Sequence, residues 1–208
     1  MTDRPFGPRE VDALQELASI GCGQAITALG KLTNRRIDMD VPEAWVGAET
    51  GAIASFLGAL GTDILAVGVK LEGKLTGDLL LALPERDAEV LAALLGFPVG
   101  CGPGQWSGMA ESALLESGNI VGSAFVSAVA ALVREKLLLS VPSLARGSGK
   151  LCVEQLVSHA GSVALATRFT CERTEQGPGL EGLILVMPDP EKIAVLVGHL
   201  LAEQREGP

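Results

Sequence analysis

The sequence repeats itself with an offset of one hundred residues. The segment Asp-Ala-Leu-Gln-Glu-Leu-Ala-Ser that begins at Asp12 matches the segment Ser-Ala-Leu-Leu-Glu-Ser-Gly-Asn that begins at Ser112, and each is followed by a Val-Pro pair, at 41–42 and at 141–142. The identical pairs continue without a gap; they include Ala13 and Ala113, Leu14 and Leu114, Glu16 and Glu116, Ile20 and Ile120, Ala28 and Ala128, Leu32 and Leu132, and Gly47 and Gly147. Matches spread over a helix-long segment indicate an internal duplication, so the two halves are expected to fold alike.

The length and composition suit one domain made of two small halves that share a core. The chain has 208 residues, of which 48% are hydrophobic and 20% are charged, an ordinary balance for a globular protein. Because aromatic residues make up only 3% and Tyr is absent, the core must consist mainly of Leu, Val, Ala and Ile. We therefore predict a single domain over residues 1–208, with internal repeats at about 9–96 and 107–204.

The charge and the hydropathy of the chain argue against several classes of protein. A net charge of −9 disfavours binding to nucleic acid or to an anionic membrane surface, because both depend on clustered Lys and Arg. No apolar run is expected to approach the roughly 20 residues that span a bilayer. The first ten residues lack the apolar segment of a signal peptide. These features favour a cytoplasmic protein that binds neither nucleic acid nor a membrane.

The cysteines and histidines argue against a disulfide framework or a metal site. The chain contains Cys22, Cys101, Cys152, Cys171, His159 and His199. The cysteines are far apart, without a Cys-x-x-Cys pair, and the histidines share no motif spacing. Reduced thiols and no metal bound by the chain itself are therefore expected.

Hydrophobic periodicity predicts two long amphipathic helices, from Arg9 to about Lys31 and from about Trp106 to Glu135. The predicted core-facing residues are Leu14, Gly21, Ala25, Ala28 and Leu32 in the first helix, and Leu114, Val121, Phe125, Ala128 and Leu132 in the second. The predicted outward-facing residues are Asp12, Glu16, Ser19, Gly23, Thr27 and Gly30 in the first helix, and Glu116, Asn119, Ser123, Ser127 and Ala130 in the second. Beyond the carboxylates, this outward side consists of short residues that another protein could approach closely.

The segments after each long helix predict a sheet. Strands are expected at about 37–41, 63–72, 75–83, 137–141, 151–159, 163–170 and 183–187, and residues 44–58 form either a strand or a short helix. Helices from Pro84 to Leu95 and from Pro188 to about Glu203 complete the two halves. Short turns between strands favour antiparallel pairing, so the fold class is α+β. Two pseudo-symmetric halves (helix, strands, helix) should share one core, with the two long helices on a largely antiparallel sheet.

A Glu-x-x-Asn pair lies on the outward side of the second long helix. Residues three apart on a helix are neighbours, so Glu116 and Asn119 should project together. Asn is a mediocre residue inside a helix, because its side chain competes for backbone hydrogen bonds. Exposed Glu and Asn are usually ordinary surface residues. The duplicated Glu16 and the equally spaced prolines make a shared function the stronger hypothesis.

These residues resemble the motif of the CheC/CheX/FliY phosphatases of bacterial and archaeal chemotaxis, with CheC the most similar. That motif is Asp or Ser, three residues, Glu, two residues, Asn, twenty-two residues and Pro. The second copy fits it at every position, with Ser112, Glu116, Asn119 and Pro142. The first copy fits it with Asp12, Glu16 and Pro42, but Ser19 stands where Asn belongs. The resemblance extends over about residues 9–203.

The resemblance implies that the chain hydrolyses the phosphoaspartate of a CheY-type response regulator. By family precedent, Asn119 would orient the attacking water and Glu116 would pair with the receiver's active-site lysine. Glu16 and Ser19 would then form a degenerate second site, and Ser112, Asp12 and Ser123 would help to bind the partner. The chain would need no cofactor of its own, because the receiver domain binds the Mg²⁺.

Two non-catalytic alternatives stay open. The same fold serves in flagellar switch components, where it binds response regulators or scaffolds an assembly without hydrolysis. Some CheC proteins also bind the receptor deamidase CheD, although the Gly/Pro-rich joint at 96–107 offers no convincing docking helix for it. The intact motif around Glu116 and Asn119 favours the phosphatase over both.

Overall fold

The computed structural model describes residues 6–47, 49–97, 106–158, 163–175 and 177–206. The first half contains α1 (Pro8–Thr33), β1 (Asp38–Met39), β2 (Glu43–Val46), α2 (Thr50–Gly58), β3 (Ile64–Gly73), β4 (Gly77–Pro84) and α3 (Glu85–Leu94). The second half contains α4 (Gly108–Val133), β5 (Leu137–Leu139), β6 (Ser143–Gly147), α5 (Gly149–Leu156), β7 (Val163–Cys171), β8 (Leu180–Pro188) and α6 (Pro190–Glu206). The predicted joint between the halves falls largely at 98–105, outside the described residues.

All eight strands of these described segments belong to one antiparallel sheet. The strand order is β1-β7-β8-β4-β3-β5, with β2 also paired to β7 and β6 also paired to β3. Between the halves, β1 corresponds to β5, β2 to β6, β3 to β7 and β4 to β8. If each strand is replaced by its counterpart, the same strand order results, read in the opposite direction. The edge strands β1 and β2 therefore complete the second half of the sheet, and β5 and β6 complete the first half.

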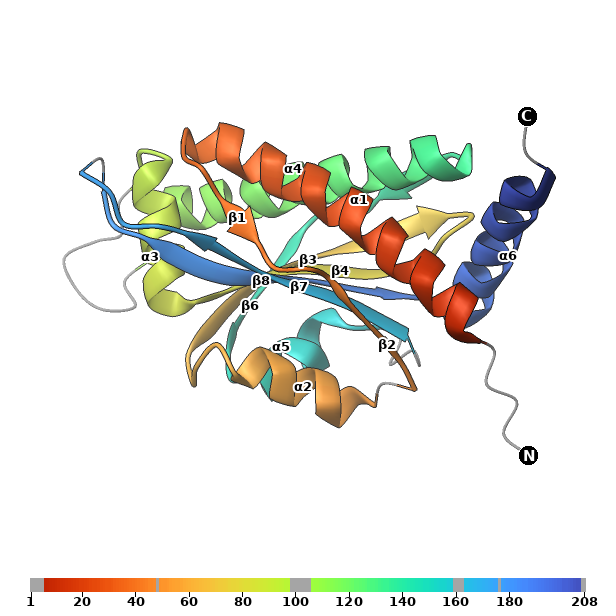
Figure 1. Cartoon of the computed structure of the whole chain (residues 1–208). Coiled ribbons are helices and arrows are strands. Elements are labelled where there is room, and N and C mark those ends of the chain that lie inside the picture. The colour runs from red at the N-terminus through yellow and green to blue at the C-terminus, as the bar shows by residue number, and fades with distance from the viewer. Residues whose placement is uncertain (1–5, 48, 98–105, 159–162, 176, 207–208) are drawn as a thin grey trace.

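Helices cover both faces of the sheet. The long helices α1 and α4 lie on one face, the short helices α2 and α5 lie on the other, and α3 and α6 stand at opposite ends (Figure 1). The larger apolar layer lies under the long helices and includes Leu14, Phe125 and Phe169. The smaller layer lies under the short helices and includes Ile53 and Leu183. Both halves contribute to both layers, and the predicted α+β class with two pseudo-symmetric halves is confirmed.

One predicted strand is wrong. Residues 151–159 were expected to be extended, but the chain forms α5 there, and β6 precedes it. The buried side chains Cys152, Val153 and Leu156 recur at helical spacing, and the Ser148 hydroxyl caps the helix by accepting from the Leu151 amide at 3.3 Å. The ambiguous segment 44–58 is its counterpart and contains both a strand, β2, and a helix, α2. Each half therefore has a third, short helix that the periodicity did not resolve.

The hydropathy of α4 also differs from expectation. Among the described residues, α4 is the one helix whose length and composition would suffice to cross a membrane, although no apolar run of that length was expected. The core helix of a soluble protein can have the same length and apolar composition as a membrane-spanning helix. In this structure α4 packs against α1, β3 and β5, with residues such as Leu114, Val121 and Phe125 buried.

The exchange of edge strands predicts that neither half folds alone. Fragments 1–97 and 106–208, expressed separately, should lack a cooperative thermal transition, because β7 then lacks β1 and β2 while β3 lacks β5 and β6. Mixing the fragments should restore the transition, measured by circular dichroism. The control is the full chain cut at a protease site placed within 98–105, which should stay folded. A fragment that melts cooperatively as a monomer would contradict this prediction.

Candidate functional site

The two long helices begin and end at equivalent positions. Glu10 closes the start of α1 by accepting from the Gly7 amide at 3.0 Å, and Ser107 caps α4 by accepting from the Ala110 amide at 3.1 Å. Both helices end at a left-handed residue, Asn34 (φ 53°) in α1 and Arg134 (φ 52°) in α4. The duplication therefore extends to the boundaries of the two helices. Residues one hundred positions apart in the sequence occupy equivalent places along α1 and α4.

Glycines allow α4 to lie close to the sheet and to α1. A side chain at Gly118 would collide with Val67 of β3, and one at Gly122 would lie 2.9 Å from a methyl carbon of Val69. At the crossing with α1, the ring of Phe125 packs against Gly21. These close contacts set the rotation of α4 about its own axis, because a rotated helix would bring larger side chains onto the sheet.

The rotation of α4 directs the predicted motif outward. Ser112, Glu116, Ser123 and Ser127 are exposed, and Asn119 is half-buried at the edge of this stripe. Within the described residues, neither the Glu116 carboxylate nor the Asn119 carboxamide has a hydrogen-bond or ion-pair partner. Both side chains are thus available to a partner, and they stand one turn apart on a helix that the core holds in place.

The corresponding face of α1 differs at the decisive position. Asp12 and Glu16 are exposed, as predicted, and Ser19 is half-buried. The Ser19 hydroxyl donates to the Gln15 carbonyl oxygen at 2.8 Å, so it is turned back onto its own helix. The first copy therefore presents carboxylates without a free polar side chain at the position that Asn119 occupies in the second copy.

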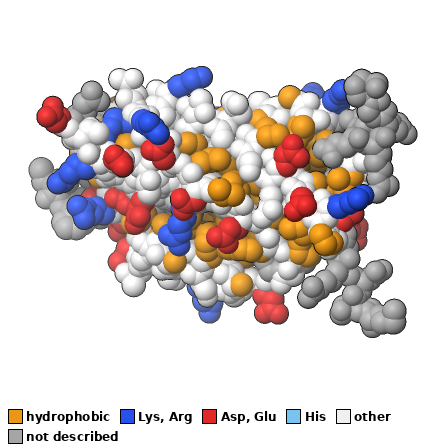
Figure 2. All heavy atoms as spheres, viewed as in Figure 1, with side chains coloured by type: hydrophobic (Ala, Val, Ile, Leu, Met, Phe, Trp, Pro, Cys, Tyr) orange, Lys and Arg blue, Asp and Glu red, His pale blue; other side chains and the backbone are white. Residues whose placement is uncertain are grey.

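The structure adds exposed apolar residues that the motif does not include. Ile20 is 37% exposed one turn after Glu16, and its counterpart Ile120 is half-buried. Val41 and Val141, which precede the repeated prolines, are 83% and 86% exposed. The duplication of Ile and of Val-Pro was visible in the sequence, but their exposure was not. In Figure 2, which shows one face of the molecule, hydrophobic side chains gather centrally among scattered charges of both signs.

Other residues that could support chemistry are poorly placed for it. Cys22 lies inside the core, where desolvation raises the pKa of its thiol to about 12, so it stays protonated and is a poor nucleophile. Within the described segments, no group of three or more His, Cys, Asp and Glu side chains could hold a metal ion. Cys101 and His159 lie outside the described residues. What the site offers chemically is one carboxylate and one carboxamide on the outward surface of a helix.

Similarity to known proteins extends over most of the chain. Residues 10–45 match the CheC-like family. The chain is similar to the CheY-P phosphatase CheC of Bacillus subtilis, with 29% identity over 203 residues that cover 92% of this chain and 95% of that protein.

Among solved structures, Thermotoga maritima FliY superposes with a TM-score of 0.68 at 16% identity, covering 95% of this chain and 98% of FliY. The CheX chain of a CheX–CheY–BeF₃–Mg²⁺ complex from Borrelia burgdorferi superposes with a TM-score of 0.54 at 17% identity, covering 86% and 99%. At these identities the superpositions show a shared fold.

The glycine contacts predict a stability difference between two helical positions. Gly118→Ala should lower the free energy of unfolding by about 1–3 kcal/mol, because the new methyl group collides with Val67 under α4. Gly198→Ala in α6 is the matched control, since a Cβ there meets nothing within 4 Å. It should be neutral or stabilise by up to about 1 kcal/mol. Urea denaturation measures both, and equal effects would contradict the close approach of α4 to the sheet.

Proposed function

We propose that the chain is a phosphatase for the phosphoaspartate of a CheY-type receiver domain, because it is similar to a CheC protein over nearly its whole length. The support is of two kinds. The similar Bacillus subtilis protein is a CheY-P phosphatase, and a protein of the same fold, CheX, is found in a complex with CheY. The observation that carries the proposal is the pair of Glu116, which is exposed, and Asn119, which is half-buried beside it without a partner among the described residues, one turn apart on the helix α4.

The chemistry of an acyl phosphate suits so small a site. An aspartyl phosphate is already reactive, so the visiting protein only has to place a water molecule in line with the phosphorus. A carboxamide can do this, because its oxygen accepts a hydrogen bond from the water while its NH₂ group donates to a phosphoryl oxygen. Gln performs the corresponding task in GTPases. No nucleophile or general base is required of this chain, and positioning alone can lower a barrier by several kcal/mol.

The two motif residues have different tasks in this proposal. Asn119 enters the partner's phosphorylated pocket and orients the water. Glu116 pairs with the receiver's active-site lysine and holds the register of the two proteins. Ser112 and Ser123 are exposed on the same stripe and let the receiver's surface approach α4 closely. The Mg²⁺ belongs to the receiver, and the chain supplies no cofactor.

The first copy serves at most as a docking surface. A serine hydroxyl is shorter than a carboxamide and cannot bridge the water and the phosphoryl oxygen at once. The Ser19 hydroxyl also donates to the carbonyl oxygen of Gln15. Glu16 and Asp12 remain exposed on α1, so this face keeps the charged residues of the motif without its water-orienting group.

The rival function is binding without hydrolysis, to a response regulator, to a flagellar switch component or to CheD. The intact Glu-x-x-Asn pair on α4 favours catalysis, because a scaffold has no need of an unpaired carboxamide. The joint considered for CheD falls largely at 98–105, outside the described residues. Release of radiolabelled phosphate from a CheY-type receiver separates hydrolysis from binding.

Replacing Asn119 tests the catalytic assignment. Asn119→Ala should lower the rate of phosphate release on the order of 10²–10³-fold, as loss of one transition-state hydrogen-bonding group does. Its affinity for the receiver should stay within a few-fold, because Glu116 is still present. The matched control is Ser127→Ala on the same exposed stripe two turns further along α4, which should leave the rate unchanged. If Asn119→Ala keeps full activity, the assignment is wrong.

Restoring the carboxamide to the first copy tests its proposed degeneracy. In the Asn119→Ala background, Ser19→Asn should recover at least part of the lost phosphate release, because α1 then presents Glu and Asn at the motif spacing. Ser19→Ala in the same background is the control and should recover none. Complete failure of Ser19→Asn, with receiver binding intact, would show that more than the carboxamide is missing from the first copy.

A further inference from the structure

A bulge interrupts the sheet edge between β5 and β6, at the second Val-Pro pair. Residues 140–142 of the edge oppose only residues 69–70 of β3, because the ladder is paired on both sides of them. The Ser140 amide donates to the Lys70 carbonyl oxygen at 3.0 Å, and the Lys70 amide donates back to the Ser140 hydroxyl at 2.9 Å. A bulge turns a side chain out of the regular ladder, and this one leaves Val141 86% exposed.

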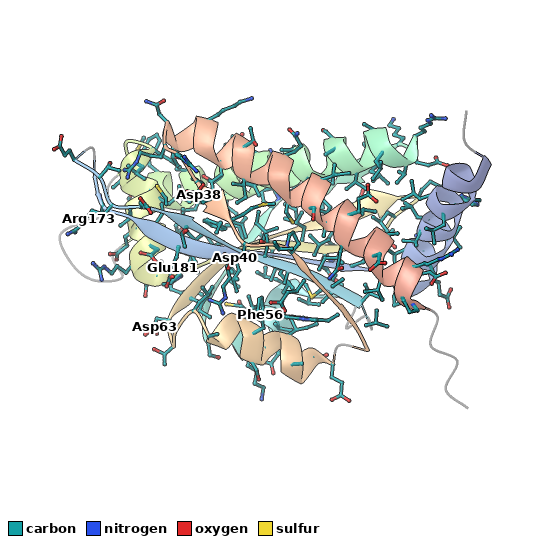
Figure 3. All side chains as sticks on the ribbon, in the orientation of Figure 1. Asp38, Asp40, Phe56, Asp63, Arg173 and Glu181 are labelled. Atoms are coloured by element: carbon teal, nitrogen blue, oxygen red, sulfur yellow. The ribbon has the colours of Figure 1, made fainter. Side chains whose placement is uncertain are left out.

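The first copy has the same bulge between β1 and β2. Residues 40–42 oppose residues 167–168 of β7, and the Asp40 amide donates to the Arg168 carbonyl oxygen at 2.9 Å. Figure 3 shows Asp40 at the sheet edge beneath α1. Each long helix therefore has a bulge of the same shape beside it, and differences between the two bulges lie in their side chains.

The β5–β6 bulge (residues 140–142) lies level with the turn of α4 that carries Asn119. Gly118 lies over Val67 of β3. One turn later, Gly122 lies over Val69. The bulge opposes Val69 and the residue after it, on the neighbouring strand about 5 Å away across the sheet. The motif turn and the bulge are therefore neighbours along the same stretch of β3.

Asn119 is on the flank of α4 that faces this edge. Leu139, which leads into the bulge, reaches that flank, because a Cβ at Gly122 would lie 3.2 Å from its Cδ1 atom. At 100° per residue, Asn119 lies about 60° further round the helix from Gly122, towards solvent. On the opposite flank Ser117 and Val121 are fully buried. A protein that reaches Asn119 from outside therefore approaches across the β5–β6 bulge.

The two edges differ in charge. At three positions the first-copy edge carries a carboxylate where the second-copy edge is uncharged: Asp38 and Leu138, Asp40 and Ser140, and Glu43 and Ser143. Charged residues commonly protect an exposed sheet edge from pairing with another chain. The second-copy edge lacks these charges and still displays an exposed valine, so protection against pairing does not account for it.

We propose that the β5–β6 bulge is part of the surface that docks the phosphorylated receiver, an inference that rests on the proposed phosphatase function. Val141 packs against an apolar patch of the receiver beside its phosphorylated pocket, while Glu116 and Asn119 reach into the pocket. An uncharged bulge suits this partner, because carboxylates and a phosphoryl group surround a bound Mg²⁺. The carboxylates of the first-copy edge would repel the same pocket, so the bulge helps to select α4 over α1 as the receiver's face.

Steady-state phosphate release by the full chain separates docking from chemistry. Val141→Asp should raise KM for the phosphorylated receiver on the order of tenfold or more, because an apolar contact is replaced by a charge. Its kcat should stay within about twofold, since Asn119 is unchanged. Ser140→Asp, which introduces the first-copy residue, should raise KM several-fold at low salt and less at high salt.

Leu138→Asp is the matched control on the same edge. Leu138 is 51% exposed, but Leu139 faces α4, so strand alternation turns Leu138 to the other face of the sheet. Its KM at physiological salt should stay within about twofold of the wild-type value. Circular dichroism should show the same thermal midpoint for Val141→Asp as for the wild type, because the valine is exposed in the folded chain.

The reciprocal change tests the charge on the first-copy edge. In the Asn119→Ala background, Ser19→Asn combined with Asp40→Ser should release phosphate several-fold faster than Ser19→Asn alone at subsaturating receiver. Asp38→Asn is the control partner for Ser19→Asn and should add little, because Asp38 is already paired with Arg36 at 2.9 Å. An Asp40→Ser change that adds nothing would contradict selection by charge.

Three further results would overturn the inference while the proposed function stands: an unchanged KM for Val141→Asp, an effect confined to kcat, or self-association of the wild-type chain that Val141→Asp abolishes. The last would make a second copy the occupant of the edge. If the wild-type chain binds a phosphorylated CheY-type receiver without hydrolysing it, the proposed function fails, and a tenfold weaker affinity of Val141→Asp would still support docking at the bulge. If it neither binds nor hydrolyses one, both fail.

Discussion

The structure depends on the pairing of each half's edge strands with the other half's sheet. β1 and β2 hydrogen-bond to β7, while β5 and β6 hydrogen-bond to β3. Backbone groups on these strands would otherwise be left without partners, so the exchange joins the halves more strongly than a contact between two finished domains would. It also constrains where the long helices end, because a short turn leads from α1 into β1 and another from α4 into β5.

This scaffold lets the two copies diverge without loss of the fold. The buried positions of α1 and α4 correspond, although most of their side chains differ, as at Gly21 and Val121 or Ala25 and Phe125. Glycines at the helix–helix and helix–sheet contacts keep the helices close. The outward faces have changed independently, with Asn119 on one helix and Ser19 on the other. At one end of the molecule, a groove of about 420 Å³ lies beside α6. Duplication has supplied two equivalent scaffolds whose outward side chains differ.

Sequence reasoning succeeded where the signal was long or duplicated. The two long helices were predicted within about two residues of their observed ends. Their hydrophobic pattern repeats over many turns, so single residues that depart from it have little effect on the prediction. Glu116 was predicted to be exposed and is. The short helix α5 was mistaken for a strand, since Cys152, Val153 and Leu156 span little more than one turn and give too few repeats to establish the helical period. Val195 is 60% exposed on α6, which local periodicity does not predict for an apolar residue.

The sequence by itself determined the duplication, the long helices and the spacing that places Glu116 beside Asn119, because these follow from residues that are neighbours along the chain. Only the tertiary structure decided which strands pair across the halves, that two short helices form a third layer, and that a groove lies beside α6. Those outcomes depend on contacts between residues far apart in sequence. They are settled by the length of connections and the fit of side chains in three dimensions, neither of which leaves a periodic pattern in the chain.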